Sequence, residues 1–306
     1  MMSQGAQDLA GKLLGRRLRA ELETLLAKPL APGLYLVATP IGNLADISLR
    51  ALAVLASADR LYCEDTRHSR KLLSRYGIER STASYHQHNA ARVRPEILSA
   101  LAAGMSVALV TDAGTPLISD PGFKLARAAL ADGRNVVSIP GPSAVLAALT
   151  ASGLPTDTFL FAGFLPARSQ ARRARLAKLK DVAATLIFFE APSRLPSLLD
   201  DLGEILGDRA GAIARELTKF NEEVRRDRLS ALAAWTRNTD LRGEFVVLAA
   251  PPGPPEVGDE AILAKLETAL ETMSLRDAVM SVAEALGAAK SRVYDLALGL
   301  ERKQGK

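Results

Sequence analysis

The sequence predicts an α/β fold class with two α/β domains, a parallel-sheet N-terminal domain and a mixed-sheet C-terminal domain, plus a small helical C-terminal tail. After Pro32, short apolar runs alternate with helical stretches, which is typical of parallel α/β architecture. A turn of only about five residues around Lys219 joins two later strands, too few for a crossover, so part of the second sheet should be antiparallel. A third series of apolar positions at helical spacing follows residue 260 and predicts the tail.

The first series is expected to contain strands 34–38, 60–63, 107–111 and 136–139, with helices 49–58, 94–103 and 123–131 between them. The second is expected to contain strands near 158–164, 185–189, 211–217, 222–226 and 245–249. The tail is expected to contain helices 261–273, 275–286 and 291–300.

Four parts are expected along the chain. Residues 1–32 are an N-terminal extension, either an amphipathic helix or disordered, and residues 33–150 form the first α/β domain. Residues 151–251 form the second, because Ser152, Gly153 and Pro155 mark a boundary, and a proline-rich linker at 251–255 ends it. Residues 252–306 resemble a helix-turn-helix.

The composition excludes several classes of protein. With 306 residues, 48% hydrophobic and 24% charged, the chain is neither disordered nor a disulfide scaffold. Cys63 is the only cysteine, which fits a reducing compartment, and we expect a cytoplasmic protein. Residues 136–156 lack charge, but three prolines and two glycines interrupt them, so no membrane span is expected. The net charge of +5 permits an acidic partner without requiring one.

Three loops follow predicted strands and could hold a ligand, because ligands of open parallel sheets bind at the carboxyl ends of the strands. They are residues 39–44 (TPIGNL), 112–122 (DAGTPLISDPG) and 140–144 (PGPSA). Helix capping by Ser119, Asp120 or Ser143 explains the ends of these loops, but not the eleven-residue stretch. Neither a dinucleotide-binding nor a P-loop glycine motif is present, so a different ligand is expected.

These loops, taken with five further motifs, resemble a known family. The motifs are EDTR (64–67), FAGFLP (161–166), FEAPSR (189–194), RELTK (215–219) and RGEF (242–245). The sequence resembles the ribosomal RNA small subunit methyltransferase I family of the tetrapyrrole-methylase superfamily, over residues 33–250 and the tail. The resemblance implies a homodimer with S-adenosyl-L-methionine in the cleft between its two domains. It also implies 2′-O-methylation of the ribose of a decoding-region cytidine (position 1402) of 16S rRNA.

The resemblance also implies which residues bind the cofactor. From the first domain these are Asp112, Ala113, Gly114, Ile118, Ser119, Ser143 and Ala144. From the second they are Phe161, Ala162, Gly163, Phe164, Leu165 and Pro192. Glycine allows close backbone approach, which fits Gly114 and Gly163. Phe161 and Phe164 could instead be core residues.

A ribose hydroxyl is a poor nucleophile near pH 7 and benefits from a base or an orienting acceptor. The catalytic candidates are Asp65, Glu216 and Lys219. Further possible bases are Glu64, Glu190, His86 and His88, with Arg67 or Lys219 lowering the pKa of the hydroxyl. The sequence does not select among them, and each could be structural.

The segment Arg168–Lys180 carries six positive charges and no negative one, directly after the FAGFLP motif. We expect it to contact phosphates of 16S rRNA or of the 30S ribosomal subunit, although such a run is often only a solvated helix face. The expected RNA-binding residues are Arg67, His88, Arg168, Arg172, Arg173 and Arg175. No metal is expected, because Cys63, His86 and His88 do not make a four-ligand zinc site.

Two other functions remain open. A methylase acting on a tetrapyrrole precursor would share the fold and the cofactor, and its polyanionic substrate would also explain the arginines. A non-catalytic ribosome assembly factor would bind the subunit without cofactor affinity.

Overall fold

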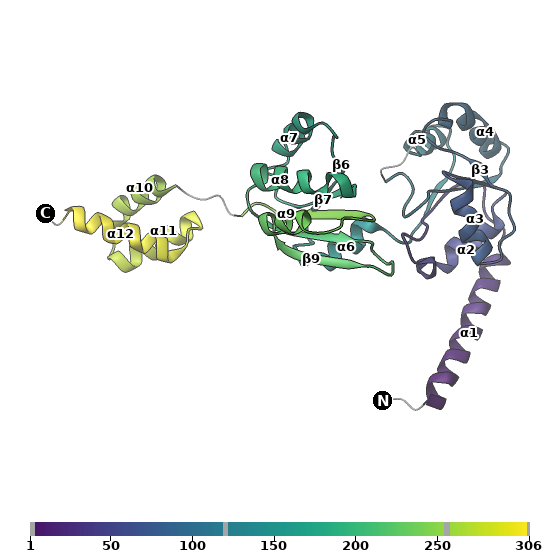
Figure 1. Cartoon of the computed structure of the whole chain (residues 1–306), viewed down its shortest axis with the longest axis horizontal. Coiled ribbons are helices and arrows are strands. Elements are labelled where there is room, and N and C mark those ends of the chain that lie inside the picture. The colour runs from purple at the N-terminus through teal and green to yellow at the C-terminus, as the bar shows by residue number, and fades with distance from the viewer. Residues whose placement is uncertain (1–3, 119–121, 254–257, 305–306) are drawn as a thin grey trace.

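The first sheet is parallel and has the strand order β3-β2-β4-β1-β5. The computed structural model describes residues 4–118, 122–253 and 258–304 (Figure 1). The strands of this sheet are β1 (Gly33–Val37), β2 (Arg60–Cys63), β3 (Ala83–Ser84), β4 (Ser106–Val110) and β5 (Val136–Ile139). All residues of β1 and β4 are buried, as expected for central strands that carry helices on both faces of the sheet.

The helices of the first domain are α2 (Leu49–Ser57), α3 (Thr66–Arg75), α4 (Ala90–Ala102) and α5 (Phe123–Ala131). Side-chain oxygens cap the N-termini of two of them. Ser48 accepts a hydrogen bond from the Ala51 N–H at α2, and Asp65 accepts one from the Arg67 N–H at α3. Residues of α2 and α3 pack on one face of the sheet, and residues of α4 and α5 pack on the other. The domain is therefore a three-layer α/β sandwich.

The second sheet has the order β6-β7-β10-β8-β9 and is mixed. Its strands are β6 (Phe159–Phe164), β7 (Thr185–Glu190), β8 (Ala210–Arg215), β9 (Glu223–Arg228) and β10 (Phe245–Ala249). β6 and β7 are parallel, and the other neighbours are antiparallel. Helix α6 (Ala144–Ser152) covers one face, and α7 (Ser169–Ala177), α8 (Leu195–Leu206) and α9 (Leu229–Arg237) cover the other. The predicted fold class is thus confirmed.

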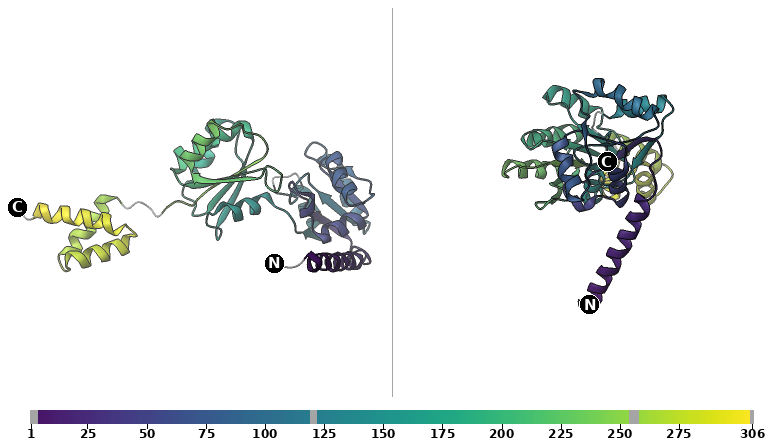
Figure 2. Two further views of the ribbon diagram at one scale, coloured as in Figure 1. Left: turned by 60° about the horizontal axis from the view of Figure 1, so that its bottom comes forward. Right: turned by 90° about the vertical axis from the view of Figure 1, so that its right-hand side faces the viewer.

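The two ends of the chain form separate elements. Helix α1 (Gln4–Leu26) packs its C-terminal end against α2 through Leu22, and the rest projects from the first domain (Figure 2). Helices α10 (Asp259–Leu270), α11 (Leu275–Leu286) and α12 (Lys290–Gln304) enclose their own apolar cluster. Gly287 ends α11 in the left-handed conformation, at φ 60°. None of the helices within the described ranges is both long and apolar enough to cross a membrane.

The structure adds elements that the sequence pattern did not predict. Helix α3 and the two-residue strand β3 were absent from the expected series, and α4 begins at Ala90 rather than at residue 94. α3 has only three buried residues, Ser69, Leu72 and Leu73, so its apolar repeat is too short to stand out.

Candidate functional site

A cavity of about 450 Å³ lies between the two sheets. Loops that follow β1, β2, β4 and β5 form its wall on the first domain, and residues at the ends of β6, β7 and β10 form the opposite wall. The lining residues are Ile41, Glu64, Thr111, Ala113, Gly114, Thr115, Ile118, Ser143, Ala144, Val145, Phe164, Phe189, Glu190, Ala191, Pro192, Leu217, Gly243, Glu244, Phe245 and Val246. The cavity is mostly apolar with a few polar groups, which is typical of a small-molecule site.

The three predicted loops meet on the first-domain side of this cavity. Thr39 and Gly114 exchange backbone hydrogen bonds of 2.9 and 3.0 Å. The Thr115 hydroxyl donates to the Pro142 carbonyl oxygen at 3.3 Å, which joins the second loop to the third. Gly114 has φ 78°, a conformation that favours glycine, and an added Cβ would lie in contact with Ile41 Cγ2 at 3.4 Å. These contacts fix the loops as one surface.

Seven of the predicted cofactor residues line the cavity: Ala113, Gly114, Ile118, Ser143, Ala144, Phe164 and Pro192. Asp112, Phe161, Ala162, Gly163 and Leu165 do not line it, and Ser119 lies outside the described residues. Phe161 instead packs edge-on against Phe189, with ring centroids 4.8 Å apart, and Leu165 is buried in the core of the second domain. Side chains alternate along a strand, so a continuous motif on β6 cannot line one cavity with every residue.

Sequence reasoning missed much of the second-domain wall, notably Leu217 and residues 243–246. Two motifs that carry the family resemblance, RELTK and RGEF, contain all of these residues except Val246, but neither motif was assigned to the cofactor. Strand β10 lies between β7 and β8 in the sheet although it comes last in sequence. The sheet order that brings residues 243–246 to the cavity is not visible in local patterns.

Glu64 is the carboxylate that the first domain presents to the cavity. Burial and, to a lesser degree, the nearby Asp112 carboxylate raise the pKa of Glu64. Asp65, next in sequence, is different, because it caps α3 and pairs with Arg67 at 2.9 Å. Hydrogen bonds from the Arg67 side chain and backbone lower the pKa of Asp65 to about 2. Asp65 is therefore a weak base, and Arg67 pairs with it rather than with Glu64.

Glu216 and Lys219 lie together, but neither lines the cavity. Lys219 Nζ is 2.8 Å from a carboxylate oxygen of Glu216 and 2.9 Å from one of Glu244. The Lys219 hydrogen bond lowers the pKa of Glu216, and both carboxylates together hold the pKa of Lys219 above its usual value despite burial. Only Glu244 of this cluster reaches the cavity wall. The cluster braces the turn between β8 and β9.

That turn also touches the first domain at Gly42. A Cβ at Gly42 would lie 2.5 Å from Lys219 Cγ and 2.8 Å from Thr218 Oγ1. The neighbouring Asn43 N–H donates to Thr218 Oγ1 at 3.0 Å. Two non-glycine residues of the turn, Glu216 and Thr218, have positive φ, at 50° and 65°. Beside the cavity, the backbone of the first domain at Gly42 and Asn43 thus contacts side chains of the second domain.

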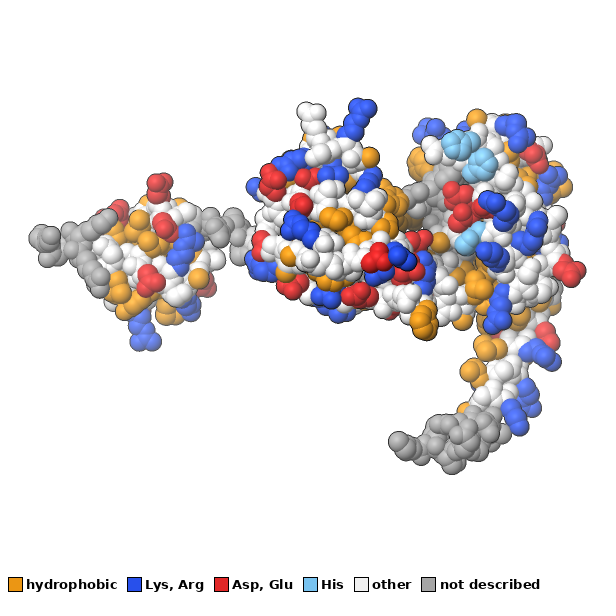
Figure 3. All heavy atoms as spheres, in the orientation of Figure 1, with side chains coloured by type: hydrophobic (Ala, Val, Ile, Leu, Met, Phe, Trp, Pro, Cys, Tyr) orange, Lys and Arg blue, Asp and Glu red, His pale blue; other side chains and the backbone are white. Residues whose placement is uncertain are grey.

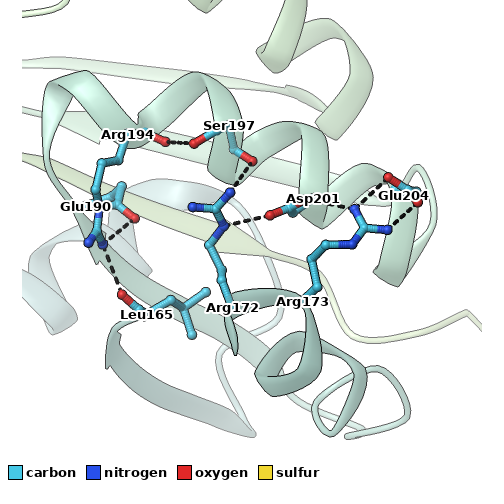
Figure 4. A network of polar contacts seen from close by, with 8 residues as sticks. All are labelled: Leu165, Arg172, Arg173, Glu190, Arg194, Ser197, Asp201 and Glu204. Carbon is cyan, nitrogen blue, oxygen red and sulfur yellow. Dashed lines mark hydrogen bonds and ion pairs between the residues drawn. The ribbon is translucent and has the colours of Figure 1, made fainter. Parts of the chain in front are cut away.

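Arginines of the second domain form a network of ion pairs with Glu190, Asp201 and Glu204, of which the first two are buried (Figure 4). Arg194 binds both oxygens of the fully buried Glu190 carboxylate, at 2.6 and 2.9 Å, and also donates to the Leu165 carbonyl oxygen. Since Glu190 lines the cavity and this guanidinium already occupies its carboxylate, Glu190 is a structural residue there.

The second part of this network corrects a prediction. Arg172 was expected to contact rRNA, but its side chain is only 6% exposed and pairs with the buried Asp201 at 2.6 Å (Figure 4). The RNA-binding prediction for Arg172 is therefore wrong, because the apolar side of α7 turns this residue inward. Arg173 pairs with Asp201 and with Glu204. Arg168, Arg175 and His88 are exposed.

Metal binding has no support in the described ranges, where no three His, Cys, Asp or Glu side chains group closely enough to hold an ion. Cys63 is buried, and burial raises the pKa of its thiol. His86 and His88 have ring centroids 6.0 Å apart, in an edge-on contact.

The fold and the cavity define a class of protein. The family of Tetrapyrrole (Corrin/Porphyrin) Methylases matches residues 33–233. A crystal structure of diphthine synthase superposes with a TM-score of 0.57 at 18% identity, covering 71% of this chain and 89% of that chain. The structure of uroporphyrin-III C-methyl transferase from Thermus thermophilus, complexed with S-adenyl homocysteine, superposes with a TM-score of 0.51 at 20% identity. The match covers 71% of this chain and 97% of that chain. The chain is a methyltransferase of the tetrapyrrole-methylase fold.

The sequence relatives identify the family more narrowly. A ribosomal RNA small subunit methyltransferase I from Mesorhizobium japonicum is 51% identical over 281 residues, which covers 91% of this chain and 96% of the relative. One from Pseudomonas aeruginosa is 46% identical over 280 residues and covers 89% and 98%. The RsmI C-terminal HTH domain matches residues 256–301. The chain belongs to the ribosomal RNA small subunit methyltransferase I family, as the motifs predicted.

Proposed function

We propose that this protein is an S-adenosyl-L-methionine-dependent methyltransferase that 2′-O-methylates the ribose of a decoding-region cytidine of 16S rRNA in the cytoplasm. The observation that carries the proposal is the apolar interdomain cavity of about 450 Å³ with a single partly buried carboxylate, Glu64, on its first-domain wall. The substrate is expected to be 16S rRNA or the 30S subunit, and the enzyme to act as a homodimer.

The residues of the cavity fit the cofactor. Its adenosine needs apolar walls, which Ile41, Val145, Phe164 and Pro192 provide, and Gly114 leaves backbone room beside them. When bound, S-adenosyl-L-methionine supplies an activated methyl group on a cationic sulfur. The chain's own task is to hold the ribose oxygen in line with that methyl group and to exclude water.

We assign Glu64 as the general base that accepts the proton of the 2′-hydroxyl. It lines the cavity, its carboxylate has a raised pKa, and no arginine or lysine among the described residues pairs with it. A general base works best when its pKa lies near the operating pH, so a raised pKa favours Glu64 over Asp65, whose pKa is about 2. Glu64 accepts the proton that the 2′-hydroxyl loses.

The first test is chemical. Purified chain is incubated with labelled S-adenosyl-L-methionine and with 30S subunits or deproteinised 16S rRNA from a deletion strain, and the modified nucleotide is located by mass spectrometry. We expect one 2′-O-methylcytidine in the decoding region. Methylation of a tetrapyrrole precursor instead, or rRNA binding without methyl transfer, would overturn the proposal.

The second test isolates the base. Glu64→Gln should lower kcat by roughly 10²–10⁴-fold while the affinity for S-adenosylhomocysteine changes little. Because the carboxylate must be ionised, the wild-type rate should rise with pH through a pKa above the ordinary 4.5, and this limb should vanish in the variant. Glu244→Gln, at another carboxylate of the cavity wall, is the matched control. An equal loss in both variants would contradict the assignment.

A further inference from the structure

Helix α3 presents a face made of cations. Its ten residues include Arg67, Arg70, Lys71 and Arg75 and no acidic residue. All four are exposed, whereas Ser69, Leu72 and Leu73 turn toward the sheet. Arg67, Lys71 and Arg75 are spaced by four residues, so they follow one row along the helix at intervals of about 6 Å. We call Arg67, Arg70, Lys71 and Arg75 the α3 face.

The charges of this face are largely free. In the part of the chain that the structure describes, Arg67 pairs with Asp65, and Arg70, Lys71 and Arg75 take part in no ion pair. Figure 3 shows Lys, Arg and His side chains gathered over this part of the first domain, beside the cleft. A surface that leaves several cations unpaired fits a polyanionic partner.

A groove of about 370 Å³ lies along the same helix. It is formed by α3 and the segment 78–82, and Thr66, Ser74 and Ser81 bring hydroxyl groups to it. Arg70 supplies an unpaired guanidinium. Arg80, which also lines the groove, is already bound to the Ala58 carbonyl oxygen. One acidic residue, Glu79, is part of the lining. Hydroxyls and a guanidinium around a small groove suit a phosphate group.

The position of α3 links this surface to the reaction. The helix begins at Thr66, two residues after Glu64, which lines the interdomain cavity. The α3 face therefore begins next to the part of the cavity wall that Glu64 forms. None of the four cations lines that cavity, so the α3 face does not take part in binding the proposed cofactor.

We propose that the α3 face and the adjoining groove bind the sugar-phosphate backbone of the rRNA substrate next to the nucleotide that enters the cavity. The proposal rests on the proposed function for the identity of the RNA. Phosphate contacts of this kind position a nucleic acid without reading its sequence, so the face sets affinity rather than the choice of base.

The affinity of the full-length wild-type chain is first measured for purified 30S subunits and for deproteinised 16S rRNA. The variants are then compared on the substrate that the wild-type chain binds more tightly. The triple variant R70Q/K71Q/R75Q should lower affinity about 100-fold near 0.1 M salt and reduce the slope of log K against log[salt] by about 2. Arg67 is left intact because of its contact with Asp65. Affinity for S-adenosylhomocysteine should match wild type, which shows that the domains are folded.

The matched control is R16Q/R17Q/R19Q, which removes the same charge from exposed residues of α1. It should change affinity by no more than about threefold. Equal losses in both triple variants, an unchanged slope in the α3 variant, or a change confined to self-association in sedimentation would each overturn the proposal. Methyl transfer to the wrong nucleotide, or none, with the expected slopes intact would contradict only the proposed function.

Discussion

Helices α3 and α7 look alike in sequence and differ in what they present to solvent. Both are short and basic and contain no acidic residue. α7 faces α8, where Asp201 and Glu204 neutralise Arg172 and Arg173, whereas the cations of α3 have one acidic partner among the described residues, Asp65 at the beginning of the helix. The charge of a segment is therefore not the charge that it offers to a partner, because tertiary neighbours decide which cations remain free.

The pairing in α7 has a structural purpose. Arg172 and Asp201 are both buried, and neither could be left without the other, since an isolated charge in the interior is strongly unfavourable. The pair joins α7 to α8, and Arg194 joins α8 to the cavity wall through Glu190. α7 is thus part of the scaffold behind the interdomain cavity, whereas α3 is part of a surface.

The largest expected effect tests the scaffold role of α7. Asp201→Ala leaves the Arg172 guanidinium buried and unpaired, so the free energy of unfolding should fall by about 3–5 kcal/mol. Urea denaturation followed by circular dichroism measures it. Glu204→Ala, whose side chain is 65% exposed, should have little effect. If the two variants are equally stable, the comparison of the helices fails.

A smaller effect is expected from a substitution that gives α3 an acidic partner of the kind that α7 has. Ser74→Glu places a carboxylate within one helical turn of Arg70 and Lys71, which neutralises part of the α3 face. The affinity for rRNA should fall by about tenfold near 0.1 M salt. Ser74→Gln has the same size as the glutamate variant and also lacks the groove hydroxyl, but it adds no charge, so the tenfold loss is measured against Ser74→Gln. Equal binding by the glutamate variant would show that the RNA lies elsewhere.

The smallest effect concerns the beginning of α3. Asp65→Asn keeps a capping oxygen, so the methyl-transfer rate should stay well short of the roughly 10²–10⁴-fold loss expected for a general base. Because the pKa of Asp65 is lowered to about 2, its contribution to stability is present above its ordinary pKa and is lost as the pH falls through about 2. Acid titration of α3 helicity in the wild type and the variant measures this. A large loss of rate at neutral pH would restore Asp65 as the base.

The sequence predicted the fold well where apolar runs are long. The buried strands β1, β4 and β10 and the antiparallel part of the second sheet were all recognised from such runs and from the short turn at Lys219. Helix α3 was not recognised, because most of its ten residues are polar and only Leu72 and Leu73 mark its buried face.

Residues of the cavity wall were predicted where they belong to one continuous loop. They were missed where the order of the strands in the second sheet brings them to the cavity. Ala113, Gly114 and Ile118 lie in one loop after a predicted strand, and the family resemblance assigned them to the site. Val246 was not predicted, since only the insertion of β10 between β7 and β8 brings it to the cavity. The burial of Arg172 depends on Asp201, 29 residues away, and no local pattern contains that partner.

The contact at Gly42 has a consequence for how wide the cleft can be. Lys219 and Thr218 come so close to this backbone that even one methyl group has no room, so the glycine acts as a mechanical stop between the domains. Any larger residue is expected to push the turn between β8 and β9 away from the first domain and to enlarge the interdomain cavity. The width of the cavity is in this way tied to a residue that does not line it.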